Sequence, residues 1–235
     1  AGIAAEPSLS TVDKLETIWF NLGRDLILGN PIFSVAANVV RRRSYLQSSQ
    51  PLRDLLERML PAKTFEELQV PFHCVAANIE RAQEHWFSQG PLIPAILASA
   101  AVPGLLPVVE INGEHFMDGG IVNSIPIERA IHLGATELYV LHVGRVEHPL
   151  APPRNLVQTA VIAFEIARRH RFFRDMASLP EGVTAHVLPT GESEPPGKYD
   201  ALSQLRYRDV SAIRRRIARA HRATSAYLER LAEHR

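Results

Sequence analysis

The sequence predicts an α/β fold in which helices cover a sheet to form a sandwich. Three short and mostly apolar runs have the length and composition of buried strands: Phe72–Ala77, Glu137–Val143 and Thr184–Leu188. Segments with apolar residues at helical spacing stand between them, and this alternation is typical of α/β architecture. The length of 235 residues and the apolar share of 46% allow one core, so a single domain over residues 1–235 is expected.

Three helices are expected in the first seventy residues. In residues 11–28 apolar side chains recur at helical spacing, with Ser10 or Thr11 as the N-cap. A second helix is expected over Pro51–Leu60, because proline is tolerated in the first turn. Thr64–Leu68 has the pattern of a capping box and predicts a third, short helix.

Further helices are expected after the first strand. Pro91–Ala101 and Ser124–His132 are short, and Gly134 is placed to end the second of them. Two long amphipathic helices are predicted at Leu156–Ala177 and Asp209–Glu233. The second belongs to a C-terminal helical segment at about residues 200–235.

A β-hairpin is expected around Asn112-Gly113. Val108–Ile111 and His115–Met117 supply the two strands, and Asn-Gly between them indicates a type I′ turn. Asp118 stands directly after the second strand. The carboxyl ends of strands are where open α/β sheets place their ligands.

Asp118 is followed by Gly119 and Gly120, which leave no side chains to cover the carboxylate. Two interpretations of the acid follow from the residues alone. Asp-Gly is a common turn signal, because aspartate caps its own backbone and glycine adopts positive φ without strain. Alternatively, the carboxylate is a proton acceptor in catalysis.

The motifs around Asp118 resemble those of a known family in kind and in order. Ala98-Ser99-Ala100-Ala101-Val102-Pro103-Gly104 comes first, followed by Asp118-Gly119-Gly120 and then by Asn123-Ser124-Ile125-Pro126. This set resembles the second half of a patatin-like phospholipase domain, over about residues 70–145. An ordered set of short motifs is more specific than any one of them.

The resemblance implies a three-layer α/β/α sandwich and a Ser–Asp catalytic dyad. Asp118 matches the aspartate of the dyad, and the supporting motif positions are Pro103, Gly104, Gly119, Gly120 and Asn123. The family's serine lies in a Gly-x-Ser-x-Gly elbow, and its oxyanion hole is a glycine-rich loop. Neither occurs in these 235 residues.

The first residues, Ala1–Ala5, resemble the end of the helix that follows the elbow. The chain is therefore expected to begin just after the nucleophile, to lack the N-terminal strands of the sheet, and to be inactive alone.

Two classes of function remain open. The first is a serine hydrolase acting on lipid or other esters, without metal or other cofactor, of which this chain carries the aspartate half. The second is a non-catalytic relative that serves as a regulatory or lipid-binding module. The sequence immediately before Ala1 would discriminate them, because a Gly-x-Ser-x-Gly there supports the enzyme.

Composition narrows the partners. The net charge of +1 gives no reason to expect binding to nucleic acid. The sequence contains no run of 18 apolar residues, so no transmembrane helix is predicted. A cytoplasmic or peripheral-membrane location is expected. The single cysteine, Cys74, excludes an internal disulfide and is expected to be an inert buried thiol.

Two other features each have a structural and a functional interpretation. Arg41–Arg43 follows the apolar stretch Ile32–Val40, either as a basic helix end or as a lid that touches anionic lipid. Among ten histidines, His142 at a predicted strand end is the strongest candidate for a rival triad, although no elbow serine is present to pair with it.

Overall fold

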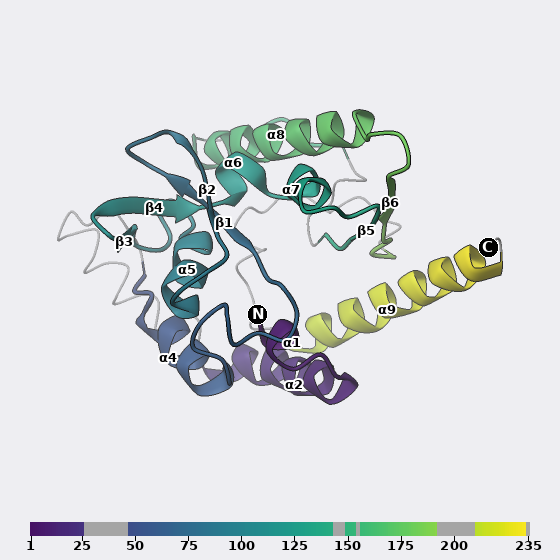
Figure 1. Cartoon of the computed structure of the whole chain (residues 1–235), viewed down its shortest axis with the longest axis horizontal. Helices are drawn as coiled ribbons and strands as arrows, with labels where there is room; N and C mark the ends of the chain where they lie inside the picture. The colour runs from purple at the N-terminus through teal and green to yellow at the C-terminus, as the bar shows by residue number, and fades with distance from the viewer. Residues whose placement is uncertain (26–46, 143–148, 154–155, 192–209, 234–235) are drawn as a thin grey trace. The chain divides into compact units, whose positions relative to one another are not determined.

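The computed structural model describes residues 1–25, 47–142, 149–153, 156–191 and 210–233 (Figure 1). Contacts divide the chain into two compact units, Ala1–Asn123 and Ser124–Arg235. Both units mix helices with strands, in agreement with the predicted α/β class. A single domain over the whole chain stays a prediction.

The first unit opens with a four-residue helix, where the resemblance expects the end of a helix, and then with the first of the three predicted helices. α1 spans Gly2–Ala5 and α2 spans Leu9–Asp25. The hydroxyl of Ser8 accepts a hydrogen bond from the Thr11 amide at 3.2 Å, which is a helix N-cap interaction. The cap was predicted at Ser10 or Thr11. That prediction was wrong because Leu9, in the first turn, is 85% exposed and adds nothing to the apolar periodicity.

α4 spans Gln50–Met59, with proline in its first turn as predicted. The short helix expected at Thr64–Leu68 is absent, and a turn stands there instead. The Phe65 amide donates to the Gly90 carbonyl at 3.1 Å, and the Gly90 amide donates to the Glu66 carboxylate at 2.9 Å. Bonds to a distant segment therefore replace the helical bonds that the capping-box pattern predicted.

The sheet of the first unit has four strands, all antiparallel, in the order β2-β1-β4-β3. β1 spans Cys74–Asn78, and its last four residues are consecutively buried, as expected for a strand covered on both faces. β3 spans Val109–Ile111 and β4 spans Glu114–Asp118. The predicted hairpin turn between them is confirmed, because Asn112 and Gly113 have φ of 54° and 80°.

β2, at Gln83–Phe87, was not predicted. Its residues are exposed or half-buried, so they show no apolar run, and pairing with β1 is what makes this segment a strand.

Two helices pack against this sheet, and Figure 1 draws α5 below the strands and α6 above them. α5 spans Leu92–Ser99 and contacts β1, β3 and β4. Ala76 and Ala98 are fully buried with Phe116 between helix and sheet, and the two small side chains allow close approach. α6, at Gly120–Asn123, contacts β1 and β2.

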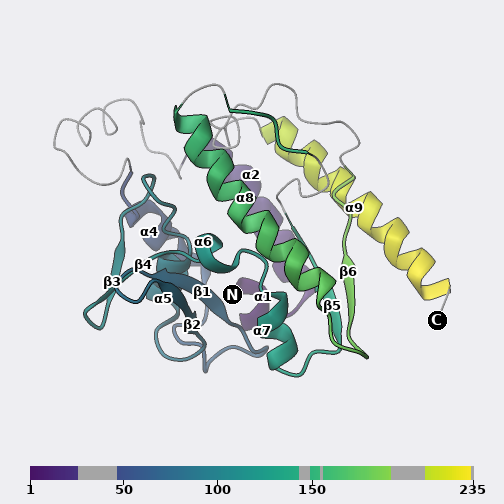
Figure 2. The same cartoon turned by 90° about the horizontal axis from the view of Figure 1, so that it is seen from above.

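The second unit contains α7 (Ile127–His132), β5 (Glu137–Val140), α8 (Leu156–Ala177), β6 (Thr184–Val187) and α9 (Val210–Glu233). β5 and β6 form a parallel pair, and α7 packs against α8 (Figure 2). The chain leaves α7 through Gly134 at φ 91°, as expected.

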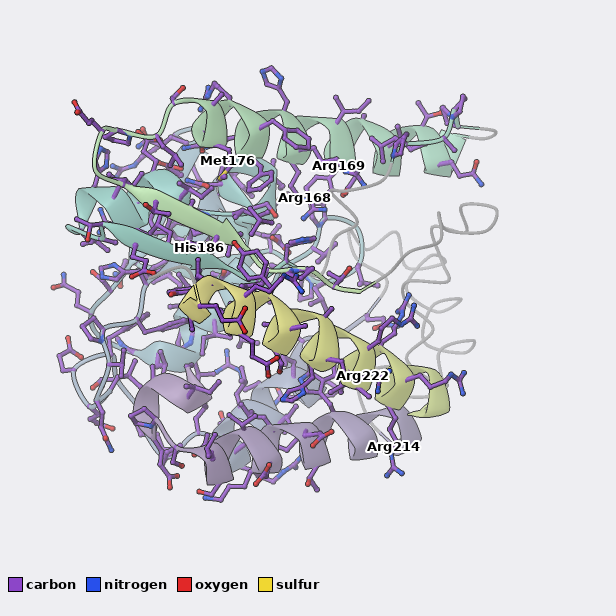
Figure 3. The ribbon with its side chains drawn as sticks, turned by 90° about the vertical axis from the view of Figure 1, so that its right-hand side faces the viewer. Arg168, Arg169, Met176, His186, Arg214 and Arg222 are labelled. Carbon is purple, nitrogen blue, oxygen red and sulfur yellow. The ribbon has the colours of Figure 1, made fainter. Side chains whose placement is uncertain are left out.

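The core of the second unit joins its elements through a few large side chains. Ile127, Leu138, Val140 and Phe172 are buried together. The side chain of His186 on β6 lies toward α9 (Figure 3), and its Nδ1 is 3.0 Å from the hydroxyl of Tyr227. This contact joins α9 to the parallel strands β5 and β6. In the described part of the chain, every helix is too short or too polar to span a membrane.

Candidate functional site

Asp118 is the last residue of β4, at the centre of the four-stranded sheet. It pairs with Ala76 of β1. Its amide donates to the Ala101 carbonyl at 3.0 Å, just beyond the end of α5. The backbone at Asp118 is therefore held by the central strand on one side and by the exit of α5 on the other.

The carboxylate of Asp118 is half-buried and faces the start of α6. The Gly120 amide donates to Oδ1 of Asp118 at 2.6 Å. The same turn continues as a helix, because the Asn123 amide donates to the Gly119 carbonyl at 2.8 Å. This aspartate thus makes the bond to the second following amide that the turn interpretation requires.

Position 119 requires glycine because there is no room for a side chain beside its Cα. A Cβ built on it would lie 2.2 Å from the carbonyl oxygen of Val75, which belongs to the backbone of β1. No side chain fits there without moving the strand. The glycine therefore lets α6 start directly against the central strand of the sheet.

Pro103 and Gly104 form the turn that brings the chain from α5 toward the hairpin. The Leu105 amide donates to the Val102 carbonyl at 3.0 Å, and Gly104 has φ 75°. Proline at the second position and a positive φ at the third fit a type II turn. The Ala101 carbonyl, just before this turn, accepts the hydrogen bond from the Asp118 amide. The turn therefore begins beside β4, the strand that carries Asp118.

Asn123 ends α6 and is only 2% exposed. Its Nδ2 donates to a carboxylate oxygen of Glu84 on β2 at 3.0 Å. Sequence reasoning missed Glu84, since the signal would have been a predicted strand at β2. The pair crosses β1 and ties α6 to the outer strand, so the motif asparagine holds the turn that follows Asp118.

The remaining candidates belong to other parts of the sequence. His142 is buried just beyond β5 in the second unit. Arg41–Arg43 and Ile32–Val40 fall outside the described residues. Within the described part of the chain, no group of three or more histidine, cysteine or acidic side chains is arranged to hold a metal ion.

Cys74 opens β1, and burial raises the pKa of its thiol to about 12. A thiol with so high a pKa carries almost no thiolate at neutral pH and is a poor nucleophile. This agrees with the expectation of an inert cysteine.

Several proteins are similar in sequence to part of this chain. An uncharacterized NTE family protein of Mycobacterium tuberculosis is 33% identical over 92 residues, which are 39% of this chain and 24% of the relative. A lysophospholipase nte1 of Emericella nidulans is 29% identical over 90 residues, or 36% of this chain and 6% of the relative. The chain thus matches about a quarter or less of the length of these relatives.

The family model described as patatin-like phospholipase matches residues 3–131. The match covers more than half of the chain and includes both α5 and the stretch from Asp118 to Asn123. The resemblance seen in the ordered motifs is therefore confirmed, and the chain belongs to the patatin-like phospholipase family.

Proposed function

We propose that this chain contributes the general base of a serine lipid acyl hydrolase, with Asp118 as the aspartate of a Ser–Asp dyad. Family membership supports lipid ester hydrolysis as the class of reaction. The observation that carries the proposal for Asp118 is its setting at the exit of β4. There Gly119 presses against the backbone of β1 and Gly120 donates to the carboxylate, so no side chain from either residue covers it.

The proposed reaction needs a base because a serine hydroxyl is a weak nucleophile. As the serine oxygen attacks the ester carbonyl carbon, its proton passes to the Asp118 carboxylate and then to the departing alcohol. In the second half, water attacks the acyl carbon of the acyl-serine and Asp118 takes a proton from that water. As the bond from the acyl carbon to the serine oxygen breaks, Asp118 returns the proton to the serine oxygen and the fatty acid leaves. The bond from Gly120 to Oδ1 orients the carboxylate throughout.

The substrate class in this proposal is a lipid ester. Several relatives are named lysophospholipase, which favours a glycerophospholipid that carries one acyl chain. The 235 residues hold no Gly-x-Ser-x-Gly. A serine and an oxyanion loop from outside these residues would therefore complete the site, within a three-layer α/β/α sandwich.

A second candidate is a non-catalytic module with the same fold. The bond from the Gly120 amide to Asp118 favours it, since an aspartate that only forms a turn makes the same contact. The missing elbow serine is compatible with it as well.

The substitution Asp118→Asn separates the two candidates. Asparagine keeps the shape and still accepts the bond from Gly120, but it cannot accept the serine proton. In a protein that includes the serine, ester hydrolysis should fall by at least ~10², the low end for losing a general base. The melting temperature should stay near wild type.

Asp118→Ala is the matched variant, because it removes both the base and the turn contact. It should lose activity and also some thermal stability, which Asp118→Asn retains. Near-normal hydrolysis by Asp118→Asn would end the catalytic assignment and leave the turn role.

A further inference from the structure

A cavity of about 480 Å³ lies within the first unit, among α1, α2, α4 and α5. Figure 1 shows α1, α2 and α4 gathered on one side of that unit. The side chains that line the cavity are mainly large and apolar. They include Leu15, Ile18, Trp19, Leu56, Met59 and Ile96.

The cavity opens to the surface through apolar side chains. Trp19 and Met59 both line it, yet they are 45% and 44% exposed. Exposed large apolar groups at the mouth of an apolar cavity are typical of a site for an apolar ligand.

Few polar groups line the cavity. Thr11 shares a hydrogen bond of 3.0 Å with Ser8, so its hydroxyl already has a partner. Lys14 pairs with Glu6 at 3.4 Å, and both of these side chains are largely exposed. The interior thus suits a hydrocarbon chain. The edge carries the Lys14 ammonium group paired with the Glu6 carboxylate, and an anionic head group would take the place of Glu6 beside Lys14.

We propose that this cavity binds the single acyl chain of an anionic monoacyl lipid, with its head group beside Lys14. The volume falls in the lower part of the range for ligand pockets, ~300–1,000 Å³, which favours one chain over two. The inference rests on the proposed function only for the lipid nature of the ligand. Binding requires no catalysis, so it can be measured separately from hydrolysis.

Trp19 provides the reporter. The chain has two tryptophans, and Trp86→Phe leaves Trp19 as the only one. Fatty acids brominated near the chain end should quench its fluorescence saturably below their micelle concentration. Each added methylene should tighten binding roughly three- to fourfold until the cavity is full.

Filling the cavity should abolish this binding. In the Trp86→Phe background, Leu15→Phe combined with Leu56→Phe should weaken it by about tenfold or more, with no loss of melting temperature. Leu9→Ser is the matched control, because Leu9 is 85% exposed on the same helix and does not line the cavity. Its affinity should equal that of the parent.

Lys14→Gln tests the head group. It should weaken binding of the fatty acid anion but leave binding of a neutral monoacylglycerol with the same chain unaffected.

Brominated lysophosphatidylcholine distinguishes the two possible sources of the acyl chain. If it binds as well as the fatty acid, the site accepts substrate; if only the fatty acid binds, the site holds the product of hydrolysis.

Three results would overturn the proposal: no saturable quenching, equal quenching after the cavity is filled, or quenching seen only when Trp86 is the reporter. Concentration-dependent dimerisation without lipid binding would assign the apolar mouth to a second copy instead. Asp118→Asn should bind the lipid normally. A failed dyad and a failed acyl site therefore give different outcomes.

Discussion

Gly119 and Gly120 follow the same carboxylate but meet different physical requirements. Gly119 has no room for a Cβ, because the carbonyl oxygen of Val75 would lie 2.2 Å from it. Gly120 contributes its amide, which donates to Asp118 at 2.6 Å. The pair of glycines thus combines a close backbone approach with a hydrogen bond that orients the acid.

Gly119→Ala should therefore destabilise the first unit strongly. Its new methyl group would overlap backbone, which cannot rotate away as a side chain does, so a cost of about 3 kcal/mol or more in the free energy of unfolding is expected. Urea unfolding of the chain measures it.

Gly104→Ala is the matched control. Nothing lies within 4 Å of a Cβ at Gly104, so the only cost there is its φ of 75°, about 1–2 kcal/mol. Equal losses in the two variants would show that φ, and not space, governs both glycines.

At the scale of elements, α8 is held by a cluster of charges. Glu165 accepts hydrogen bonds from Arg168 and from Arg169, the latter at 3.0 Å, and all three side chains are largely buried. Arg168 also donates to the Ser124 hydroxyl at 3.3 Å. Figure 3 shows both arginines on the same helix. One carboxylate thus serves two buried guanidinium groups.

Glu165→Gln should destabilise the protein by about 3 kcal/mol at neutral pH, because it leaves two buried cations without their shared anion. Urea unfolding at pH 7 measures the difference from wild type. A difference below about 0.5 kcal/mol would mean that other contacts of the arginines suffice.

The same pair of proteins should show a pH dependence. Burial alone would raise the pKa of Glu165, but bonds and charges from Arg168 and Arg169 outweigh it and hold the pKa below its ordinary value. The carboxylate's contribution is therefore complete above the pKa of the unfolded chain and is lost as pH falls through the lower folded value. Wild type and Glu165→Gln should converge in stability at acid pH.

At the scale of the whole molecule, the proposed dyad is divided. The base lies in this sequence, whereas no Gly-x-Ser-x-Gly does. Residues 1–235 alone should therefore not hydrolyse a short-chain nitrophenyl ester. Turnover that disappears in Asp118→Ala would reveal a nucleophile within these residues and contradict the expectation.

Local interactions explain what could be predicted from the sequence. The turn at Asn112 and Gly113 depends on two residues that tolerate positive φ, and the long helix at Leu156–Ala177 depends on adjacent turns. The ordered motifs also indicated the family and the candidate aspartate. None of these needs information from a distant segment.

Nonlocal contacts decided the rest. β2 is a strand because β1 pairs with it, and Thr64–Leu68 is a turn because Gly90 takes its hydrogen bonds. Glu84 joins the site through its bond to Asn123, 39 positions away in the chain. The sequence by itself determined the family, the hairpin and the candidate acid, since these depend on neighbouring residues. Only the tertiary structure decided which strand lies beside the acid and why Gly119 has no side chain, because both depend on segments brought together by folding.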